Sequence, residues 1–314
     1  MSLFLGVDGG NTKTIAIVAT ADGRPVGCGR AGPSDIYNAP TPALAIDEIA
    51  QAVKAALDGR DGSEVAGACF SLAGADWPED IELLRSELGR RLGIAPPAVV
   101  NDAIGALRAG TSDGRGVSVV IGTYTAIGAG LASGEHWHVS FWGEPVYGFD
   151  LSRMAIDAAV RSQLGILPTS ALCDLVPLRL GCTSVEEVVH RLTGRGLARP
   201  ARARASLALL DAAAAGDAVA CAALSRAAAS IAEFARAGAT GLGLEAPYPL
   251  VIAGGLLRHP STVLVEAVAA ALPELVPHPT DREPALGALL LACDLAGVAL
   301  DPAMIERAFR RDGA

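Results

Sequence analysis

The feature that most restricts how this chain can fold is a strand–turn–strand pattern that occurs twice. Residues 3–9 and 14–20 are apolar runs joined by the polar turn Gly9-Gly10-Asn11-Thr12-Lys13. Residues 116–121 and 126–131 repeat the arrangement around Gly122-Thr123-Tyr124-Thr125. Each pair predicts a β-hairpin, and the repetition indicates two similar units in one chain.

The segments after each hairpin alternate between expected strands and helices. In the first unit we expect a helix opening at Thr41-Pro42, strands at 26–30, 65–72 and 98–100, and helices at 78–92 and 103–109. In the second unit we expect helices over about 150–240 with a loop near 194–202, a strand at 248–253, and helices at 262–272, 284–297 and 302–311. This order predicts an α/β protein with two domains, residues 1–113 and 114–301, and a C-terminal helix, 302–314, that joins the first domain. Two similar α/β domains leave a cleft between them, which is a usual place for a ligand.

Charge and hydropathy narrow the possible partners. Lys and Arg total 25 and Asp and Glu total 34, so the net charge is −9. A chain this acidic is poorly suited to nucleic acid or anionic lipid, and we expect neither as a partner. Its apolar stretches are broken by Gly, Pro or charge before about 18 residues, so we expect no membrane span.

Cysteine usage and the N-terminal residues bear on the compartment. The six cysteines are scattered and form no C-x-x-C pair, which favours reduced thiols over a structural metal site. The first residues lack the basic segment and cleavage site of a secretory signal. We therefore expect a cytoplasmic protein.

The turn of the first hairpin has the chemistry of an anion-binding loop. Its glycines let backbone N–H groups approach an anion, Thr12 and Thr14 add hydroxyl donors, and Lys13 adds a cation. Asp8, at the end of the preceding strand, could hold a hydrated Mg²⁺. The G-x-x-x-x-G-K-[ST] pattern of a P-loop is absent. An ordinary hairpin turn remains the alternative, because Asp-Gly and Gly-Gly are common there.

The pair Asn101-Asp102 follows a short apolar strand and opens a helix. A carboxylate in this position could face a cleft and accept a proton from a substrate hydroxyl as a general base. Either residue could instead cap the helix by satisfying its free N–H groups. The two residues could also divide these tasks between them.

Other small-residue motifs gain weight from their order along the chain. Gly122-Thr123 lies in the second hairpin, Gly254-Gly255 ends an apolar strand, and Pro284-Ala285-Leu286-Gly287-Ala288 opens a late helix. With these motifs in this order, the chain resembles the sugar kinase/heat-shock chaperone/actin superfamily. Within it, the chain is most similar to the BadF/BadG/BcrA/BcrD ATPase family, which includes N-acetylglucosamine and glucosamine kinases. The resemblance covers nearly the whole chain and implies two actin-like (ribonuclease H-like) domains with nucleotide and substrate in the cleft between them.

The resemblance also implies roles for individual residues, with ATP and Mg²⁺ as cofactors and a homodimer as the assembly. Asp8 would lie near Mg²⁺ and hold it through water, and Asp102 would be the general base. ATP would contact the two hairpin turns through its phosphates and a glycine pair through its adenosine, which implicates Gly9, Gly10, Asn11, Thr12, Lys13, Thr14, Gly122, Thr123, Thr125, Gly254 and Gly255. The sugar would contact Asp35, Asn38, Ala73, Gly74, Asp102, Trp142, Gly143 and Asp150.

The sequence departs from the family pattern at three places. The second phosphate loop usually reads Gly-Thr-Gly-Ser, whereas Tyr124 replaces its second glycine here and Thr125 replaces its serine. The family's Gly-Asp-Glu-Gly-Ser stretch is altered, with Phe149 in place of Asp and Asp150 in place of Glu. Asp35 stands where bacterial members often have Asn.

These observations favour a kinase that transfers the γ-phosphate of MgATP to a hydroxyl of an amino sugar, with N-acetylglucosamine as the first expectation. Two alternatives stay open. One is a reductase-activating ATPase of the same family, which would hold an iron–sulfur cluster between subunits, although the cysteines lack a suitable pairing. The other is a sugar or nucleotide sensor that binds without turnover, which the altered loops would allow.

Overall fold

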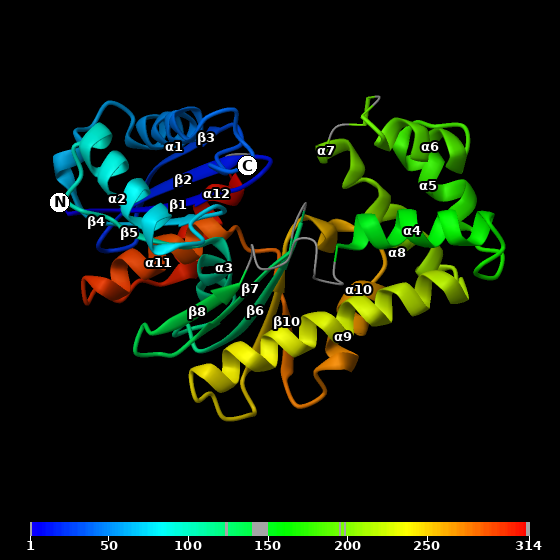
Figure 1. Cartoon of the computed structure of the whole chain (residues 1–314). Coiled ribbons are helices and arrows are strands. Elements are labelled where there is room, and N and C mark those ends of the chain that lie inside the picture. The colour runs from blue at the N-terminus through cyan, green and yellow to red at the C-terminus, as the bar shows by residue number, and fades with distance from the viewer. Residues whose placement is uncertain (1, 123–124, 140–149, 195, 198, 312–314) are drawn as a thin grey trace.

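The computed structural model describes residues 2–122, 125–139, 150–194, 196–197 and 199–311 (Figure 1). Within these residues two five-stranded sheets have the same strand order. The first sheet runs β3 (Pro25–Ala31), β2 (Thr14–Thr20), β1 (Leu3–Gly9), β4 (Val65–Leu72) and β5 (Ala98–Asn101). The second runs β8 (His136–Val139), β7 (Thr125–Gly130), β6 (Gly116–Ile121), β9 (Pro249–Ala253) and β10 (Val276–Pro279). The predicted repeat is therefore confirmed.

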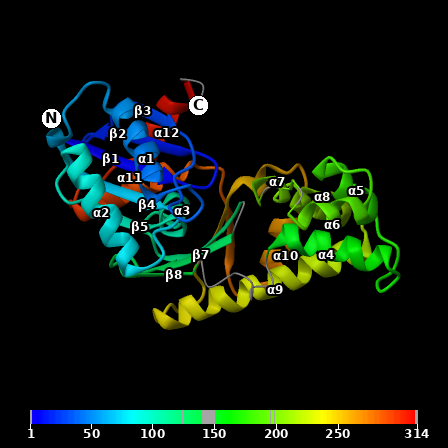
Figure 2. The ribbon, with the colours of Figure 1, turned by 45° about the horizontal axis from the view of Figure 1, so that its top comes forward.

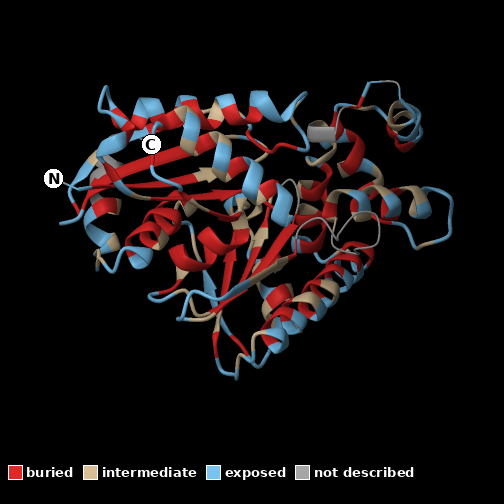
Figure 3. Ribbon diagram, turned by 60° about the vertical axis from the view of Figure 1, so that its left-hand side comes forward, coloured by how far each residue is buried: buried red, intermediate tan, exposed pale blue. Residues whose placement is uncertain are grey.

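Each sheet is built around one central strand. β1 pairs antiparallel with β2 and parallel with β4, and β6 pairs in the same way with β7 and β9. The carboxyl ends of β1, β4, β6 and β9 consequently carry the turns and loops that meet between the sheets. This is the predicted α/β architecture, and the strands are largely buried while the outer faces of the surrounding helices are exposed (Figure 3).

The helices of the first unit begin and end close to their predicted positions. Helix α1 (Pro42–Leu57) begins after Thr41, whose side chain accepts a hydrogen bond from the Leu44 N–H, and it is followed by α2 (Pro78–Leu92) and α3 (Asp102–Gly110). A short 3₁₀ turn, η1 (Gly62–Glu64), precedes β4.

The last helices along the chain are α10 (Val263–Ala271), α11 (Pro284–Leu295) and α12 (Pro302–Arg311).

Between β8 and β9 the second unit carries a helical insertion, residues 151–241, where the first unit has α1 (Figure 1). Its helices are α4 (Leu151–Gln163), α5 (Leu172–Leu180), α6 (Val185–Leu192), α7 (Arg199–Arg202), α8 (Ala205–Ala214) and α9 (Ala218–Gly241). The short helix α7 lies within the expected loop at 194–202. Helices α4 to α8 stand beside the second sheet, and α9 runs from them along its face (Figure 2).

Helix α9 is long and apolar enough to cross a membrane by length and composition alone. Half of its apolar window is buried, and residues such as Ile231 and Ala235 belong to the core beside β6 and β7. Its charged residues, Arg226, Glu233 and Arg236, are exposed on the other side. An apolar stripe facing a sheet with charges opposite is the pattern of a helix that covers a protein core.

Strand β10 and the 3₁₀ helix η3 (Gly255–Arg258) were not predicted from the sequence. β10 reads Val-Pro-His-Pro, and proline lacks the N–H that a central strand must donate. The strand is tolerated because it lies at the edge of the second sheet and pairs only with β9. Its formation depends on a partner 27 positions away along the chain, Pro249 opposite Val276, which no local pattern reveals.

Two helices cross between the sheets and join them. Helix α3 follows β5 of the first sheet but packs on β6 and β7, while α11 follows β10 of the second sheet but packs on β1 and β4. The expected domain boundaries grouped α11 with the second unit, whereas its packing is with the first sheet. Helix α12 packs on α11 and β3, so it also lies on the first sheet.

The two crossing helices touch backbone to backbone. A Cβ at Gly287 of α11 would lie 1.9 Å from the Gly105 carbonyl oxygen of α3. A Cβ at Gly6 of β1 would lie 2.1 Å from the Leu289 backbone nitrogen. Only glycine permits these contacts. An ion pair between the buried Arg108 and the exposed Asp294, with Nε to Oδ2 at 2.6 Å, joins the far ends of α3 and α11.

We expect Gly287→Ala to lower the free energy of unfolding by about 1–3 kcal/mol, because the added methyl group overlaps the Gly105 carbonyl. Gly89→Ala in α2 is the matched control, since a Cβ there would meet Ile94 O at 3.5 Å and Pro97 Cδ at 3.6 Å, both ordinary contacts. The control should be neutral or stabilise by up to ~1 kcal/mol, because alanine favours a helix over glycine. Urea unfolding of both variants measures this, and equal stability of the two would contradict the proposed close crossing.

Candidate functional site

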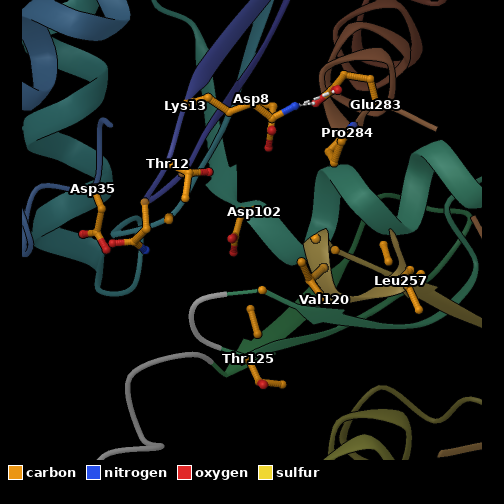
Figure 4. A pocket seen from close by; sticks show the side chains of 18 of the residues that line it. Asp8, Thr12, Lys13, Asp35, Asp102, Val120, Thr125, Leu257, Glu283 and Pro284 are labelled. Atoms are coloured by element: carbon orange, nitrogen blue, oxygen red, sulfur yellow. Dashed lines mark hydrogen bonds and ion pairs between the residues drawn. The ribbon is translucent and has the colours of Figure 1, made fainter. Parts of the chain in front are cut away.

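A cavity of about 570 Å³ lies where the ends of the two sheets meet. Most of the site residues expected from sequence line it: Asp8, Gly10, Asn11, Thr12, Lys13, Asp35, Asn38, Ala73, Gly74, Asp102, Gly122, Thr125, Gly254 and Gly255. Figure 4 shows Asp102 pointing into the space between the turn that carries Thr12 and the strand that carries Thr125. Segments far apart in the sequence therefore form one site.

Gly9, Thr14 and Asp150 were expected in the site but do not line the cavity. A Cβ at Gly9 would lie 2.5 Å from Ser34 Oγ, and the Thr14 hydroxyl lies 2.7 Å from Gly32 O and 2.8 Å from Ser34 Oγ. Both residues therefore hold the loop after β3 against the first turn. Asp150 caps α4 by accepting hydrogen bonds from Arg153 N and Ser152 Oγ. Thr123, Trp142 and Gly143 lie outside the described residues, as do the altered positions Tyr124 and Phe149.

One end of the cavity is formed by the turn between β1 and β2. Lys13 Nζ lies 2.8 Å from both carboxylate oxygens of Glu283, the residue before α11. Burial raises the pKa of Asp8, and the nearby carboxylates of Glu283 and Asp102 raise it further, while Lys13 opposes the shift. Negative charge is thus in excess here, and a cation would relieve it.

This excess of carboxylates is chemically suited to Mg²⁺. Among the described residues, no three His, Cys, Asp or Glu side chains are grouped as a protein-only metal cage. Mg²⁺ is commonly held by one or two carboxylates together with water and substrate phosphates, and Asp8 could supply the carboxylate. The donor set therefore fits an ion that arrives with a nucleotide.

Asn101 and Asp102 divide two tasks between them. The Asn101 side chain caps α3 by accepting a hydrogen bond from Ala103 N at 3.1 Å, and its Nδ2 donates to Asp76 Oδ1 at 2.9 Å. Asp102 is thereby left to face the cavity. Its Oδ1 is buried and has no hydrogen-bond partner among the described residues.

The environment of Asp102 changes its acidity. Burial, followed by the charges of Asp76 and Asp35, raises the pKa of Asp102 from 3.8 to about 7, although backbone N–H groups of the first helical turn oppose the shift. A carboxylate with a pKa near neutrality is a better base than an ordinary one, because it holds the proton it accepts more firmly.

The loop after β3 forms the wall on the other side of Asp102. Asp35 is buried, and it accepts hydrogen bonds from Tyr37 N at 2.9 Å and Asn38 Nδ2 at 2.7 Å. Gly74 has a φ of +86°, and a Cβ there would lie 2.9 Å from Asp35 Oδ1. Polar oxygens and an amide thus converge on the cavity, as recognition of a hydroxylated ligand requires.

The opposite end of the cavity is formed by β9 and η3. Gly254 has a φ of +110°, and a Cβ there would lie 2.3 Å from the Ile121 carbonyl oxygen. At Gly255, by contrast, a Cβ would meet nothing within 4 Å, so this residue leaves its side of the cavity open. The first glycine is required by packing, and the second faces open space.

Several lining residues were not named as site residues from sequence. They are Tyr37, Asp76, Val120, Ala126, Ala253, Leu257, Arg258, Thr280, Asp281, Arg282, Glu283 and Pro284. Asp76 carried a detectable signal, because it follows the glycine turn at the end of β4. The segment 280–283 carried none, because it reaches the cavity only through the unpredicted strand β10.

The strand order and the glycine-lined cleft define a two-domain α/β fold of the actin type. The family model of the BadF/BadG/BcrA/BcrD ATPases matches residues 5–292. The chain belongs to the BadF/BadG/BcrA/BcrD ATPase family, as the resemblance implied.

Similar proteins agree with this assignment. An N-acetyl-D-glucosamine kinase of Dictyostelium discoideum is 26% identical over 92% of this chain and 97% of its own. An N-acetylmuramic acid/N-acetylglucosamine kinase of Clostridium acetobutylicum is 30% identical, and that match spans 52% of this chain and 55% of the clostridial one.

Solved structures share the fold. A candidate N-acetylglucosamine kinase from Chromobacterium violaceum has a TM-score of 0.71 at 23% identity, covering 93% of this chain and 99% of the other. A ROK family glucokinase from Streptomyces griseus, solved with glucose and AMPPNP, has a TM-score of 0.60 at 20% identity, covering 94% and 99%. The predicted fold class is therefore confirmed.

The raised pKa of Asp102 predicts a pH-dependent stability difference. The folded protein binds a proton at Asp102 more tightly than the unfolded chain, so the charged carboxylate destabilises the fold increasingly as pH rises from about 4 to about 7. Asp102→Asn removes this charge. The variant should melt at a higher temperature than the wild type at pH 8, and the difference should shrink toward pH 4.

Thermal unfolding at a series of pH values measures this difference. Asp113→Asn, a change at an exposed carboxylate, is the control and should show no such trend. A melting-temperature difference for Asp102→Asn that is independent of pH would contradict the raised pKa.

Proposed function

We propose that this protein is an ATP-dependent amino-sugar kinase that transfers the γ-phosphate of MgATP to a hydroxyl group of N-acetylglucosamine or a related sugar. The observation that carries the proposal is the position of Asp102. Its Oδ1, which is buried and has no hydrogen-bond partner in the part of the chain that the structure describes, faces the cavity between the loop after β3 and the glycine turns. That is where a general base for phosphoryl transfer must stand.

The chemistry follows from this position. Asp102 accepts the proton of the sugar hydroxyl while that oxygen attacks the γ-phosphorus, and the bond from phosphorus to the β-γ bridging oxygen breaks to release ADP. Proteins catalyse phosphoryl transfer mainly by positioning the reactants and stabilising charge. Asp102 supplies the base, and the two turns supply the positioning.

The residues around Asp102 divide into a phosphate end and a sugar end. Lys13, Thr12 and the backbone of Gly10 would hold phosphate oxygens, while Asp8 would hold Mg²⁺ through water. Mg²⁺, when bound, would neutralise charge on the phosphates. Asp35, Asn38 and Gly74 would contact the sugar, and Gly255 would leave room for the adenosine.

The names of the relatives support the substrate class. Both the Dictyostelium and the clostridial relatives are named as kinases of N-acetylglucosamine, and the latter also of N-acetylmuramic acid. We therefore place N-acetylglucosamine first. The proposal includes a cytoplasmic homodimer without nucleic-acid or membrane partners.

The cysteines do not favour the reductase-activating alternative. Cys69 and Cys293 are buried between the first sheet and α11, and burial raises the pKa of each thiol to about 12. The exposed thiols, Cys28 and Cys221, belong to β3 of the first sheet and to α9 of the insertion. A shared iron–sulfur cluster needs deprotonated thiols grouped at a surface.

The decisive experiment measures ADP release from MgATP with N-acetylglucosamine, glucosamine, N-acetylmuramic acid, N-acetylmannosamine or glucose, and with no sugar. We expect release that depends on an amino sugar. Equal release without sugar would favour the ATPase alternative and count against the kinase. A thermal shift with nucleotide but no turnover on any sugar would favour a sensor.

Asp102→Asn should lower kcat by about 10²–10⁴-fold while ATP binding is retained, because asparagine keeps the shape but cannot accept the proton. Initial rates on the best sugar and calorimetric ATP titrations measure both quantities. Asp113→Asn serves again as the control. Turnover by Asp102→Asn at the wild-type rate would remove this residue from the mechanism.

A further inference from the structure

The 3₁₀ helix η3 lines the nucleotide end of the cavity but is weakly held by packing. Its residues, Gly255–Arg258, include no buried side chain. Gly254, packed on the Ile121 carbonyl, anchors the segment at its start. Leu256 and Leu257 are only partly buried against the core of the second unit, so the element needs a second anchor if it is to hold one position.

His259, directly after η3, provides that second anchor. Its side chain is only 6% exposed, although the preceding Arg258 is exposed. The Ser261 backbone N–H donates a hydrogen bond to His259 Nδ1 at 3.2 Å, and Ser261 Oγ lies 2.8 Å from the same atom. Because a backbone N–H can only donate, Nδ1 is the acceptor and the ring proton lies on Nε2.

The Nε2 proton points at the helical insertion. Nε2 donates to Asp211 Oδ1 of α8 at 3.0 Å. The other oxygen of Asp211, Oδ2, accepts a hydrogen bond from Arg179 Nε of α5 at 3.1 Å. Leu209 and Leu210 beside Asp211 are fully buried, so this carboxylate stands on a rigid part of the insertion.

We propose that His259 is a positioning residue for the nucleotide site. Through its hydrogen bond to Asp211, it fixes η3 against α8, so that the helical insertion sets the affinity for adenine nucleotide. His259 does not line the cavity and would not touch the nucleotide itself. The inference rests on the proposed function, because it assumes that adenosine lies beside Gly255 and η3.

Calorimetric titration with ATP compares the wild type with His259→Ala, His259→Gln, Asp211→Ala and the double alanine variant. We expect His259→Ala to weaken ATP binding about tenfold, as for loss of one orienting hydrogen bond to a charged group. Asp211→Ala should do the same. The double variant should bind ATP no more weakly than either single variant, because both changes break the same hydrogen bond between His259 and Asp211.

Two further variants separate positioning from general destabilisation. Glutamine can place its amide N–H near the position of Nε2, so His259→Gln should recover most of the affinity. His136→Ala changes an exposed histidine on β8 and should bind ATP like the wild type. In His259→Ala, assayed with the sugar that the panel identifies, KM for ATP should rise while KM for the sugar stays unchanged. The reason is that the loop after β3, which would contact the sugar, lies on the other side of Asp102.

The outcomes are distinct. ATP binding by His259→Ala at wild-type affinity, or no rescue by His259→Gln, would overturn the inference and leave the kinase proposal intact. Losses that add in the double variant would also overturn it. If His259→Ala does not fold, Asp211→Ala alone decides, because it breaks the same link from the other side. A wild-type protein that binds no ATP would refute the proposed function itself.

Discussion

The structure depends on one close contact, the crossing of α3 and α11 at Gly105 and Gly287. The two helices meet backbone to backbone because Gly287 carries no Cβ that would collide with the Gly105 carbonyl, and the Arg108–Asp294 ion pair closes the other end of the contact. Each helix follows one sheet and covers the other. The crossing therefore sets how the sheet ends face one another, and with it the shape of the cleft. Asp102 is the first residue of α3 and Glu283 immediately precedes α11, so the same contact places two of the charges of the site.

The packing of the fold brings several carboxylates together in the cleft, where their negative charges repel one another. Asp8, Asp35, Asp76 and Asp102 are brought together at strand ends, and burial raises the pKa of Asp8 and Asp102. Such a cluster destabilises the protein alone and is relieved by a cation or by a proton from a substrate. Lys13, which forms an ion pair with Glu283, compensates part of this negative charge. Stability is thus reduced at the place where cation binding and proton transfer are proposed.

Much of the fold could be predicted because its signals are local. Apolar runs around glycine turns identified both hairpins, and Thr41-Pro42 identified the start of α1. The pair Asn101-Asp102 left two roles open, and the structure assigned the cap to Asn101 because its side-chain oxygen accepts the hydrogen bond from Ala103 N. Strand β10 was missed because two prolines hide it, and Glu283 was missed as a consequence. His259 gave no signal either, since its partner Asp211 is 48 positions away.

The sequence by itself determined the repeated α/β unit, the glycine turns at strand ends and the order of motifs that places the chain in its family. These features depend on neighbouring residues, whose conformational preferences act within a few positions. Only the tertiary structure decided that α11 covers the first sheet, that Thr14 and Gly9 support a loop, and that η3 is tied to the insertion through His259. Those arrangements depend on which surfaces meet after the chain has folded, because burial, close backbone contact and charge pairing are properties of pairs of distant segments.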